Sequence, residues 1–208
     1  MKEEIVKALK ELREKSKKRN FVQTVDLIVS LRDLDLKKPE NRFTEDVFLP
    51  HGRGKEPTIV LISDSVREDV GCEILRGRDV EEIAKNKREA KKLAKRVDFF
   101  LAEPQLMPVI GKHLGRFLGP RNKMPKVVTG DIKAWVEKYK TAVRIKLKTS
   151  PVIQCAVGTE DMEDEKIAEN VMSVLDFLVN KLPKGKNNIR KIFLKFTMSP
   201  AVEVKVKW

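Results

Sequence analysis

The stretch Thr58-Ile59-Val60-Leu61-Ile62 decides the fold, because its continuous apolar run differs from the alternation of apolar and polar residues in 21–31. A second run is Phe99-Phe100-Leu101, and Cys72-Glu73-Ile74-Leu75 is a weaker candidate between them. Short continuous runs indicate strands that are buried on both faces. Helical spacing marks the intervening residues 80–97 and the later residues 131–139. Buried strands that alternate with helices predict a small parallel α/β sheet with helices on both faces.

Both ends of the chain follow a period of two. In residues 21–31, Val25, Leu27, Val29 and Leu31 share one face. The same alternation predicts two hairpins, one from residues 143–147 and 152–157, the other from residues 192–196 and 202–206. The polar residues 32–46 are expected to form a connection.

Two amphipathic helices complete the terminal regions. One is predicted over residues 2–18, and the other follows Gly158 with an acidic first turn at 160–165 and Lys181 in its last turn. Neither end has enough strands for a sheet of its own. The two ends therefore predict one discontinuous α+β domain with an antiparallel sheet, into which the α/β domain is inserted.

Composition points to a polyanionic partner. The chain has 208 residues, with 44 Lys and Arg against 31 Asp and Glu, a net charge of +13 and a pI near 9.7. Such a field attracts nucleic acid, although an inert, solvated basic surface would have the same composition. No apolar run approaches the roughly 18–20 residues of a membrane span, and no signal sequence is evident. We therefore expect a cytoplasmic protein without membrane contact.

Motifs for catalysis, cofactors and metals are weak. His51-Gly52-Arg53-Gly54-Lys55 resembles a phosphate loop, but Glu56-Pro57 follows Lys55 and the Walker spacing is absent, so a flexible joint is expected. Cys72 and Cys155 lack CxxC spacing, and the acidic residues 160–165 lack the pattern of a calcium loop. No enzyme, cofactor or metal site is predicted; a nucleotide-binding enzyme that uses the parallel sheet is the unfavoured alternative.

Residues 111–126 form the first candidate for RNA contact. They combine five Lys and Arg side chains and His113 with three glycines and two prolines. A rigid loop of this composition would present four of the basic side chains to phosphates: Arg116, Arg121, Lys123 and Lys126. A solvated basic loop is the competing interpretation.

The second candidate joins two distant segments. Residues 17–24 form a basic helix end that runs into a strand, and Thr197-Met198-Ser199-Pro200 is a hairpin tip. If the terminal strands share a sheet, both segments lie at one end of it. There Phe21 would stack, Thr and Ser hydroxyls would bond 2′-hydroxyls, and lysines would neutralise phosphates. The alternative is that Phe21 and Met198 pack at the edge of the core.

Four stretches occur in the order and separation seen in the ribosomal protein L1 family, the stalk protein of the large ribosomal subunit. They are residues 21–27, 49–52, 111–126 and 197–200, and the resemblance extends over essentially the whole chain. It implies that residues 1–52 and 142–208 form domain I, which binds rRNA. Residues 53–141 would form domain II, an inserted three-layer, Rossmann-like domain.

The resemblance also implies a function. The family is non-enzymatic and builds the mobile side stalk of the large subunit, which contacts tRNA leaving the exit site. Many members repress translation by binding the leader or coding region of their own mRNA. The implied protein is a monomer off the ribosome and needs no cofactor. A nonribosomal RNA-binding protein of the same fold remains the alternative.

Site residues follow from these patterns and from the resemblance. Ser199 stands where bacterial members have glycine, so the chain resembles the archaeal branch. The resemblance places the hinge at Gly52 and Ala142, and the domain II contacts with RNA or tRNA are the four side chains of residues 111–126 named above. The expected rRNA- and mRNA-binding residues are Lys17, Lys18, Arg19, Phe21, Gln23, Thr24, Thr197, Met198 and Ser199.

Overall fold

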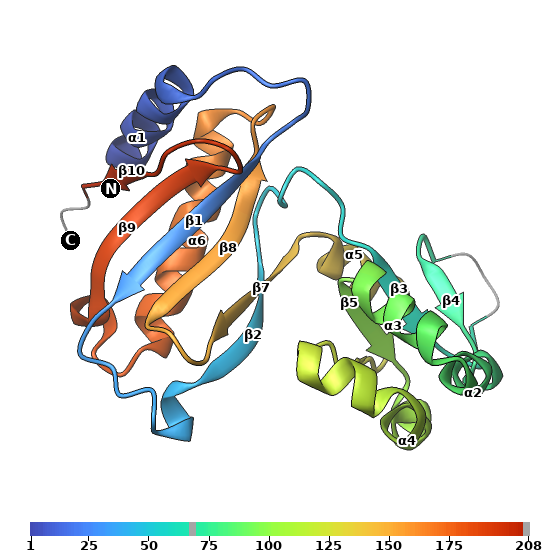
Figure 1. Cartoon of the computed structure of the whole chain (residues 1–208). Helices are drawn as coiled ribbons and strands as arrows, with labels where there is room; N and C mark the ends of the chain where they lie inside the picture. Colours follow the sequence, from blue (N-terminus) through green and yellow to red (C-terminus); the bar gives the residue numbers. More distant parts are fainter. Residues whose placement is uncertain (67–69, 206–208) are drawn as a thin grey trace. The chain divides into compact units, whose positions relative to one another are not determined.

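The computed structural model describes residues 1–66 and 70–205 and divides the chain into two compact units (Figure 1). Unit 1 comprises Met1–Glu56 and Thr141–Trp208, and unit 2 comprises Pro57–Lys140. Both units mix helices with strands, so the predicted α/β class is confirmed.

A four-stranded antiparallel sheet is the framework of unit 1. Its order is β10-β9-β1-β8, with bounds β1 Thr24–Leu31, β8 Val152–Thr159, β9 Ile189–Phe196 and β10 Val202–Val204. Along β1, Val25, Leu27 and Val29 are fully buried, whereas the alternate residues stay partly exposed. The period-two prediction for this strand and the terminal hairpin of β9 and β10 are confirmed; the predicted end of that hairpin, at Val206, lies outside the described residues.

Helices α1 (Lys2–Lys15) and α6 (Asp164–Lys181) supply the apolar side chains that cover the buried face of this sheet. Ile5, Leu9 and Leu12 form the apolar stripe of α1, as their i, i+4, i+7 spacing predicts. Short 3-10 turns at Pro39–Asn41 and Gly185–Asn188 complete the unit.

The first predicted hairpin is wrong. Strand β7 (Ala142–Leu147) does not pair with β8; it pairs with β2 (Phe43–Phe48) in a separate two-stranded sheet. The sequence hid β2 because Thr44, Glu45 and Asp46 are polar. In the structure the Arg144 guanidinium pairs with the almost fully buried Asp46 carboxylate at 2.8 Å, so the charge of Asp46 is compensated within the two-stranded sheet.

Unit 2 is built on a parallel sheet of order β4-β3-β5-β6. Its strands are β3 Ile59–Ile62, β4 Glu73–Leu75, β5 Phe99–Ala102 and β6 Lys126–Val127. One face of the sheet packs against α2 (Gly77–Lys85), α3 (Lys87–Arg96) and α4 (Met107–Leu118). On the other, α5 (Ile132–Lys140) places Tyr139 edge-on to Phe99, with ring centroids 5.4 Å apart. The continuous apolar strands thus have helices on both faces, as predicted.

Two local predictions for unit 2 are wrong. The helix expected over residues 80–97 is broken at Asn86, whose side chain accepts the Arg88 N–H and caps α3. The loop expected over residues 111–126 is largely helix α4 and the 3-10 turn Gly119–Arg121. Ile110, Leu114 and Leu118 recur at i+4 and are buried, so packing of this stripe outweighs the glycines.

Candidate nucleic-acid interface

One end of the unit 1 sheet brings together the two terminal segments that the sequence singled out. Val25 pairs with Phe196, so the residues before β1 lie beside those after β9. The Thr197 N–H donates to the Thr24 carbonyl at 3.2 Å, and the Thr24 N–H donates to the Thr197 hydroxyl at 3.3 Å. Residues 21–24 and 197–199 therefore form one surface, which we call the sheet-end site.

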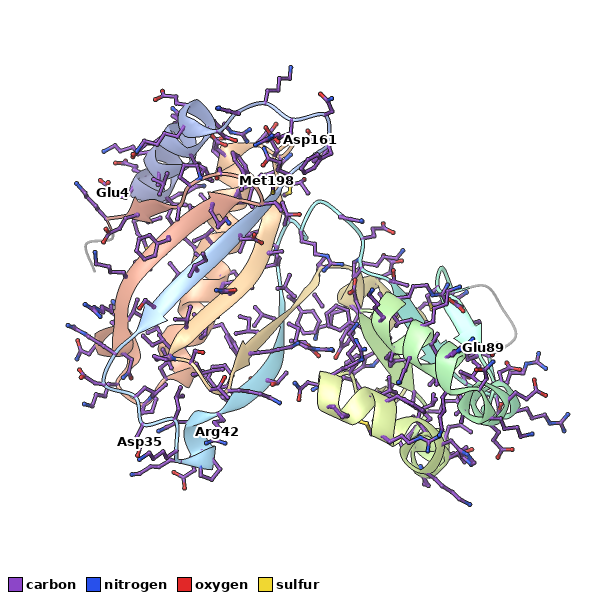
Figure 2. The ribbon with its side chains drawn as sticks, viewed as in Figure 1. Glu4, Asp35, Arg42, Glu89, Asp161 and Met198 are labelled. Carbon is purple, nitrogen blue, oxygen red and sulfur yellow. The ribbon has the colours of Figure 1, made fainter. Side chains whose placement is uncertain are left out.

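Large apolar side chains are exposed at the sheet-end site. Phe21, Val22 and Met198 are 54%, 53% and 60% exposed, the highest values among the large apolar side chains of the described residues. Figure 2 shows Met198 at the end of the sheet where β9 finishes. Exposed apolar groups that cluster in this way mark an interaction surface. Phe21 and Met198 are not part of the core edge, which was the competing interpretation.

The turn after β9 is held by Ser199. Its hydroxyl accepts the Phe196 N–H at 2.9 Å, and its own N–H donates to the Phe196 carbonyl at 3.2 Å. A further 2.9 Å contact joins the hydroxyl to the Pro200 carbonyl. Because the Ser199 hydroxyl is occupied within the turn, its role in the structure is to shape the tip rather than to reach outward.

Gln23 is a buried support for the same tip. Its side chain is only 1% exposed, and its carbonyl oxygen accepts the Met198 N–H at 3.2 Å. The amide nitrogen lies 3.3 Å from the Glu160 carboxylate and 3.4 Å from the Ser16 hydroxyl. Gln23 is thus buried beneath the tip, where its side chain holds the backbone N–H of Met198.

Arg13 is a positioning residue that the sequence did not reveal. Its guanidinium donates to the Asp164 carboxylate at 2.8 Å and to the backbone carbonyls of Glu160 and Met162 at 2.8 and 2.9 Å. It thereby ties α1 to the turn between β8 and α6. No local pattern around Arg13 indicates this role, because its three acceptors lie about 150 residues away along the chain.

A basic segment adjoins the sheet-end site. Lys17, Lys18 and Arg19 lie between the end of α1 and the start of β1, and all three are exposed. No described carboxylate forms an ion pair with them, in contrast to Lys15, which pairs with Glu11 at 2.5 Å. These unpaired charges are therefore available to an anion.

Charge on the partly exposed side of the sheet is mixed. Burial raises the pKa of Asp26, while the nearby Lys195 ammonium lowers it and leaves a net upward shift. Asp26 and Lys195 occupy paired positions on β1 and β9. Residues 21–24 and 197–199 carry no charge, so Lys17, Lys18 and Arg19 are the basic residues that directly precede the sheet-end site in the chain.

The two residues expected at the hinge are built into unit 1. Gly52, at φ +63°, accepts a 2.6 Å hydrogen bond from the Asn170 amide, whose oxygen accepts the His51 N–H at 3.1 Å. Ala142 is fully buried and pairs with Phe48 in the β2–β7 sheet. The two compact units are divided after Glu56 and after Lys140.

The candidate contacts in unit 2 fall into two groups. Arg116, Arg121 and Lys126 are exposed, and the Arg116 guanidinium stacks on Phe117 at 4.7 Å. Lys123 is partly buried, and its ammonium donates to the carbonyls of Lys95 and Val97 at the end of α3. Lys123 is therefore occupied within the fold as a cap on that helix.

The crevice where a parallel sheet would bind a nucleotide is acidic here. It lies beyond the carboxyl ends of β3 and β5, where the strand order reverses. Glu103 follows β5 and accepts hydrogen bonds from the Ser63 and Ser65 hydroxyls. Burial raises the pKa of Glu103, but these bonds, together with backbone hydrogen bonds from Asp64 and Ser65, more than offset that effect and lower the pKa. Asp64 accepts the N–H of Gly77 at 3.0 Å, at the start of α2. A carboxylate already occupies the helix start that would bind a phosphate.

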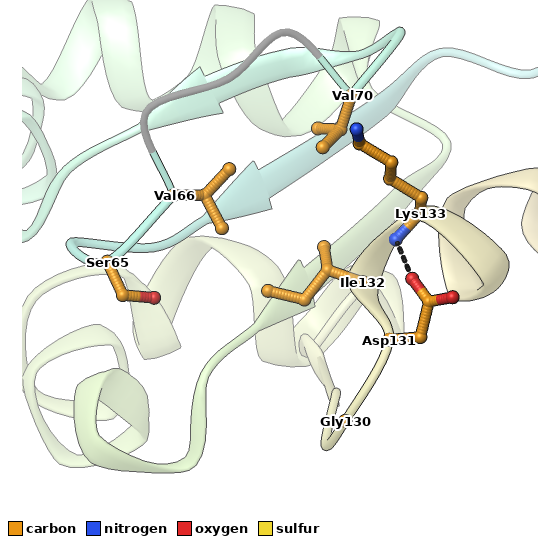
Figure 3. Close-up of a pocket in the computed structure, with 7 residues that line it drawn as sticks. All are labelled: Ser65, Val66, Val70, Gly130, Asp131, Ile132 and Lys133. Carbon is orange, nitrogen blue, oxygen red and sulfur yellow. Dashed lines mark hydrogen bonds between the residues drawn. The ribbon is translucent and has the colours of Figure 1, made fainter.

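A nearby cavity of about 450 Å³ has no reactive cluster either. Val66, Val70 and Ile132 provide its apolar lining (Figure 3). The Asp131 carboxylate turns back to accept the Lys133 N–H at 2.9 Å and so caps α5.

Within the described part of the chain, no three His, Cys, Asp or Glu side chains converge as metal ligands. Among residues 1–66 and 70–205, no helix combines the length and apolar character that crossing a bilayer requires.

Comparison with known proteins adds an independent line of evidence. The sequence model of the Ribosomal protein L1p/L10e family matches residues 12–200. Large ribosomal subunit protein uL1 of Thermococcus kodakarensis is 50% identical over 209 residues, covering 97% of each chain. The same-named protein of Pyrococcus horikoshii is 50% identical, covering 97% of this chain and 95% of the relative. That of Methanobrevibacter smithii is 48% identical, covering 98% of this chain and 100% of the relative.

Proposed function

Because the chain belongs to the Ribosomal protein L1p/L10e family, we propose that it is a non-enzymatic constituent of the large ribosomal subunit that binds large-subunit rRNA. The relatives that are about half identical in sequence bear the name of a large-subunit protein. Unit 1 would bind the rRNA through the sheet-end site. The observation that carries this assignment is the pairing of the exposed segments 21–24 and 197–199 beside the unpaired charges of residues 17–19.

The sheet-end site suits RNA better than DNA. Phe21 and Met198 offer apolar surfaces on which a base or a ribose can pack. The Thr197 hydroxyl accepts the Thr24 N–H, which leaves its own proton free to donate to a 2′-hydroxyl. Because both segments are held by backbone hydrogen bonds, the surface is preformed and would select RNA by shape.

Affinity and specificity would come from different residues. Lys17, Lys18 and Arg19 would contact phosphates, which strengthens binding to any RNA and makes it sensitive to salt. Thr24, Thr197 and Met198 would provide the discrimination between RNAs. Gln23 and Ser199 would act indirectly by holding the tip in place.

The wider role follows the family. We expect unit 1 to be anchored on the rRNA of the side stalk, with unit 2 as the projecting, inserted domain. Arg116, Arg121 and Lys126 are the exposed side chains of unit 2 that would contact tRNA leaving the exit site. Repression of the protein's own mRNA would use the sheet-end site too, so rRNA and that mRNA would compete for one surface.

A matched pair of variants tests the assignment. Met198→Ala should lower affinity for a large-subunit rRNA stalk fragment by about 10-fold or more, equivalent to roughly 1.4 kcal/mol. Arg190→Ala removes an exposed charge elsewhere in unit 1 and should change affinity less than 3-fold. Binding is measured by filter retention at fixed salt. If the two variants bind equally, the sheet-end site is not the recognition surface.

A further inference from the structure

Helix α3 carries an unusual concentration of positive charge. Unit 2 has 18 Lys and Arg against 12 Asp and Glu. Residues 85–96, which contain α3, hold seven of those basic side chains and one acidic residue, Glu89. This short segment therefore accounts for as much net charge as the whole unit.

Most of these charges are free on the surface of α3. Ala90, Leu93 and Ala94 are buried, and the basic residues of the helix are all exposed. Among the described residues, only Arg96 forms an ion pair, a bond to both oxygens of the Glu73 carboxylate. Four unpaired side chains cluster opposite the buried stripe, over about 10 Å of helix: Arg88, Lys91, Lys92 and Lys95.

Part of this charge arrangement costs the isolated helix stability. Arg88 and Lys92, and likewise Lys91 and Lys95, are like-charged pairs at i, i+4, which destabilise a helix. Lys87 and Arg88 occupy the first turn, where the helix dipole disfavours positive charge. By contrast, α1 has Glu3 and Glu4 in its first turn and pairs Lys7 with Glu4. In α3, Glu89 in the first turn and Lys95 and Arg96 in the last turn complement the helix dipole, but the like-charged pairs bring the helix no such benefit.

The position of α3 is fixed from its end. The Lys123 ammonium bonds the Lys95 and Val97 carbonyls, and the Val97 N–H bonds the Leu93 carbonyl. A helix held in this way presents its outer face with a defined geometry. No aromatic side chain lies on α3, so this face has charge but nothing on which a base can stack.

We infer that Arg88, Lys91, Lys92 and Lys95 form a second RNA-binding surface, which contacts the phosphate backbone of large-subunit rRNA from unit 2. The inference rests on the proposed rRNA binding and adds a surface that the sheet-end site does not include. RNA is favoured over an acidic protein because the chain belongs to a ribosomal protein family and because phosphate contact needs no apolar anchor. The surface adds affinity and salt sensitivity without reading sequence.

The experiment uses the full chain and a large-subunit rRNA fragment that contains the stalk and its flanking helices. One variant changes Arg88, Lys91, Lys92 and Lys95 to Gln. Its control changes Lys10, Lys37, Lys38 and Arg190 to Gln, which removes the same charge from exposed positions in unit 1. Equilibrium affinity is measured from about 50 to 200 mM salt, the range over which phosphate contacts change affinity most.

Each phosphate contact contributes roughly 0.7–0.9 to the slope of log affinity against log salt. The α3 variant should therefore lose about 2–3 from the slope and bind about 10- to 100-fold more weakly at low salt, while the control loses less than 1. Equal slopes for the two variants would overturn the inference, since the overall field would then explain binding. An unchanged slope in the α3 variant would overturn it too and would leave an acidic protein as the partner to test.

The two proposals fail in different ways. If the unmodified protein does not distinguish the rRNA fragment from a scrambled RNA, the proposed function fails. If it does, and the α3 variant keeps the original slope, only the second surface is lost. Circular dichroism of the α3 variant should match that of the unmodified protein, because all four side chains are exposed.

Discussion

The buried side-chain oxygen of Gln23 accepts the backbone N–H of Met198 at 3.2 Å, and this bond joins residues 175 positions apart. One partner is 1% exposed and the other 60% exposed. A buried amide therefore holds the backbone of the residue whose large apolar side chain is the most exposed among the described residues. This relationship separates the residues of the sheet-end site into those that face outward and those that support them.

Substitution of these two residues should have different effects on stability. Gln23→Ala removes a buried hydrogen-bonding group and should lower the free energy of unfolding by about 1–3 kcal/mol. Met198→Ala changes an exposed side chain and should alter it by less than about 0.5 kcal/mol. Both should weaken binding to the rRNA stalk fragment. Hydrogen exchange of β1 amides reports the stability of unit 1, and a stability loss in Met198→Ala would contradict the assignment.

Gly54 and Gly52 provide a test of the segment that leaves unit 1. Both have positive φ, +78° and +63°. A Cβ on Gly54 would lie 2.2 Å from the Thr159 hydroxyl oxygen, whereas on Gly52 the nearest atom is 3.8 Å away. Gly52→Ala should cost about 1–2 kcal/mol from backbone conformation. Gly54→Ala should lower the free energy of unfolding by about 1–3 kcal/mol more, because the added methyl group overlaps the Thr159 side chain and overpacks the site.

Hydrogen exchange of the β8 amides measures the loss of unfolding free energy in both glycine variants. Adding Thr159→Ala to Gly54→Ala removes the overlapping atoms and should recover most of the extra loss. Equal costs for the two single variants would mean that Gly54 does not lie against Thr159 of β8.

Glu169 should make the stability of unit 1 depend on acid. Hydrogen bonds from Lys2 and His51 lower the pKa of the Glu169 carboxyl to about 2. A carboxyl with a lowered pKa stabilises the folded state above its unfolded value, near 4.3, and that contribution is lost as pH falls through about 2. The Tm difference between the unmodified protein and Glu169→Gln should therefore be largest above pH 5 and shrink toward pH 2. A difference that stays constant across this range would exclude the ion-paired carboxylate.

The two cysteines should differ in reactivity. Burial raises the pKa of the Cys155 thiol to about 12, so almost no thiolate is present at pH 8. Cys72 is only partly buried. An aromatic disulfide reagent should label one thiol per native chain and two in guanidinium, and Cys72→Ser should abolish the native signal. Rapid labelling of Cys155 in the native Cys72→Ser protein would contradict its place in the core.

Periodicity predicted the elements whose packing depends on local pattern. The alternation of Val25, Leu27 and Val29 identified β1, and the continuous runs identified β3 and β5. Local signals misled where tertiary packing was stronger. The glycines of α4 indicated a loop, although Ile110, Leu114 and Leu118 had helical spacing.

The sheet-end site was predicted as a juxtaposition but not in its division of roles. Phe21, Thr24, Thr197 and Met198 are brought together because β1 and β9 are neighbours, which alternation at both ends suggested. The burial of Gln23 and the occupied hydroxyl of Ser199 depend on hydrogen bonds made only in the folded turn. No sequence pattern reports such bonds, and the same holds for the three distant acceptors of Arg13.

The most direct measurement compares binding of the full chain to a large-subunit rRNA stalk fragment and to a scrambled RNA of equal length across a salt series. We predict that the stalk complex stays tight as salt rises while the scrambled complex is lost, because shape and 2′-hydroxyl contacts persist when phosphate contacts are screened. Equal affinities that fall together with salt would contradict specific recognition at the sheet-end site. The net charge of +13 would then be sufficient to explain the binding.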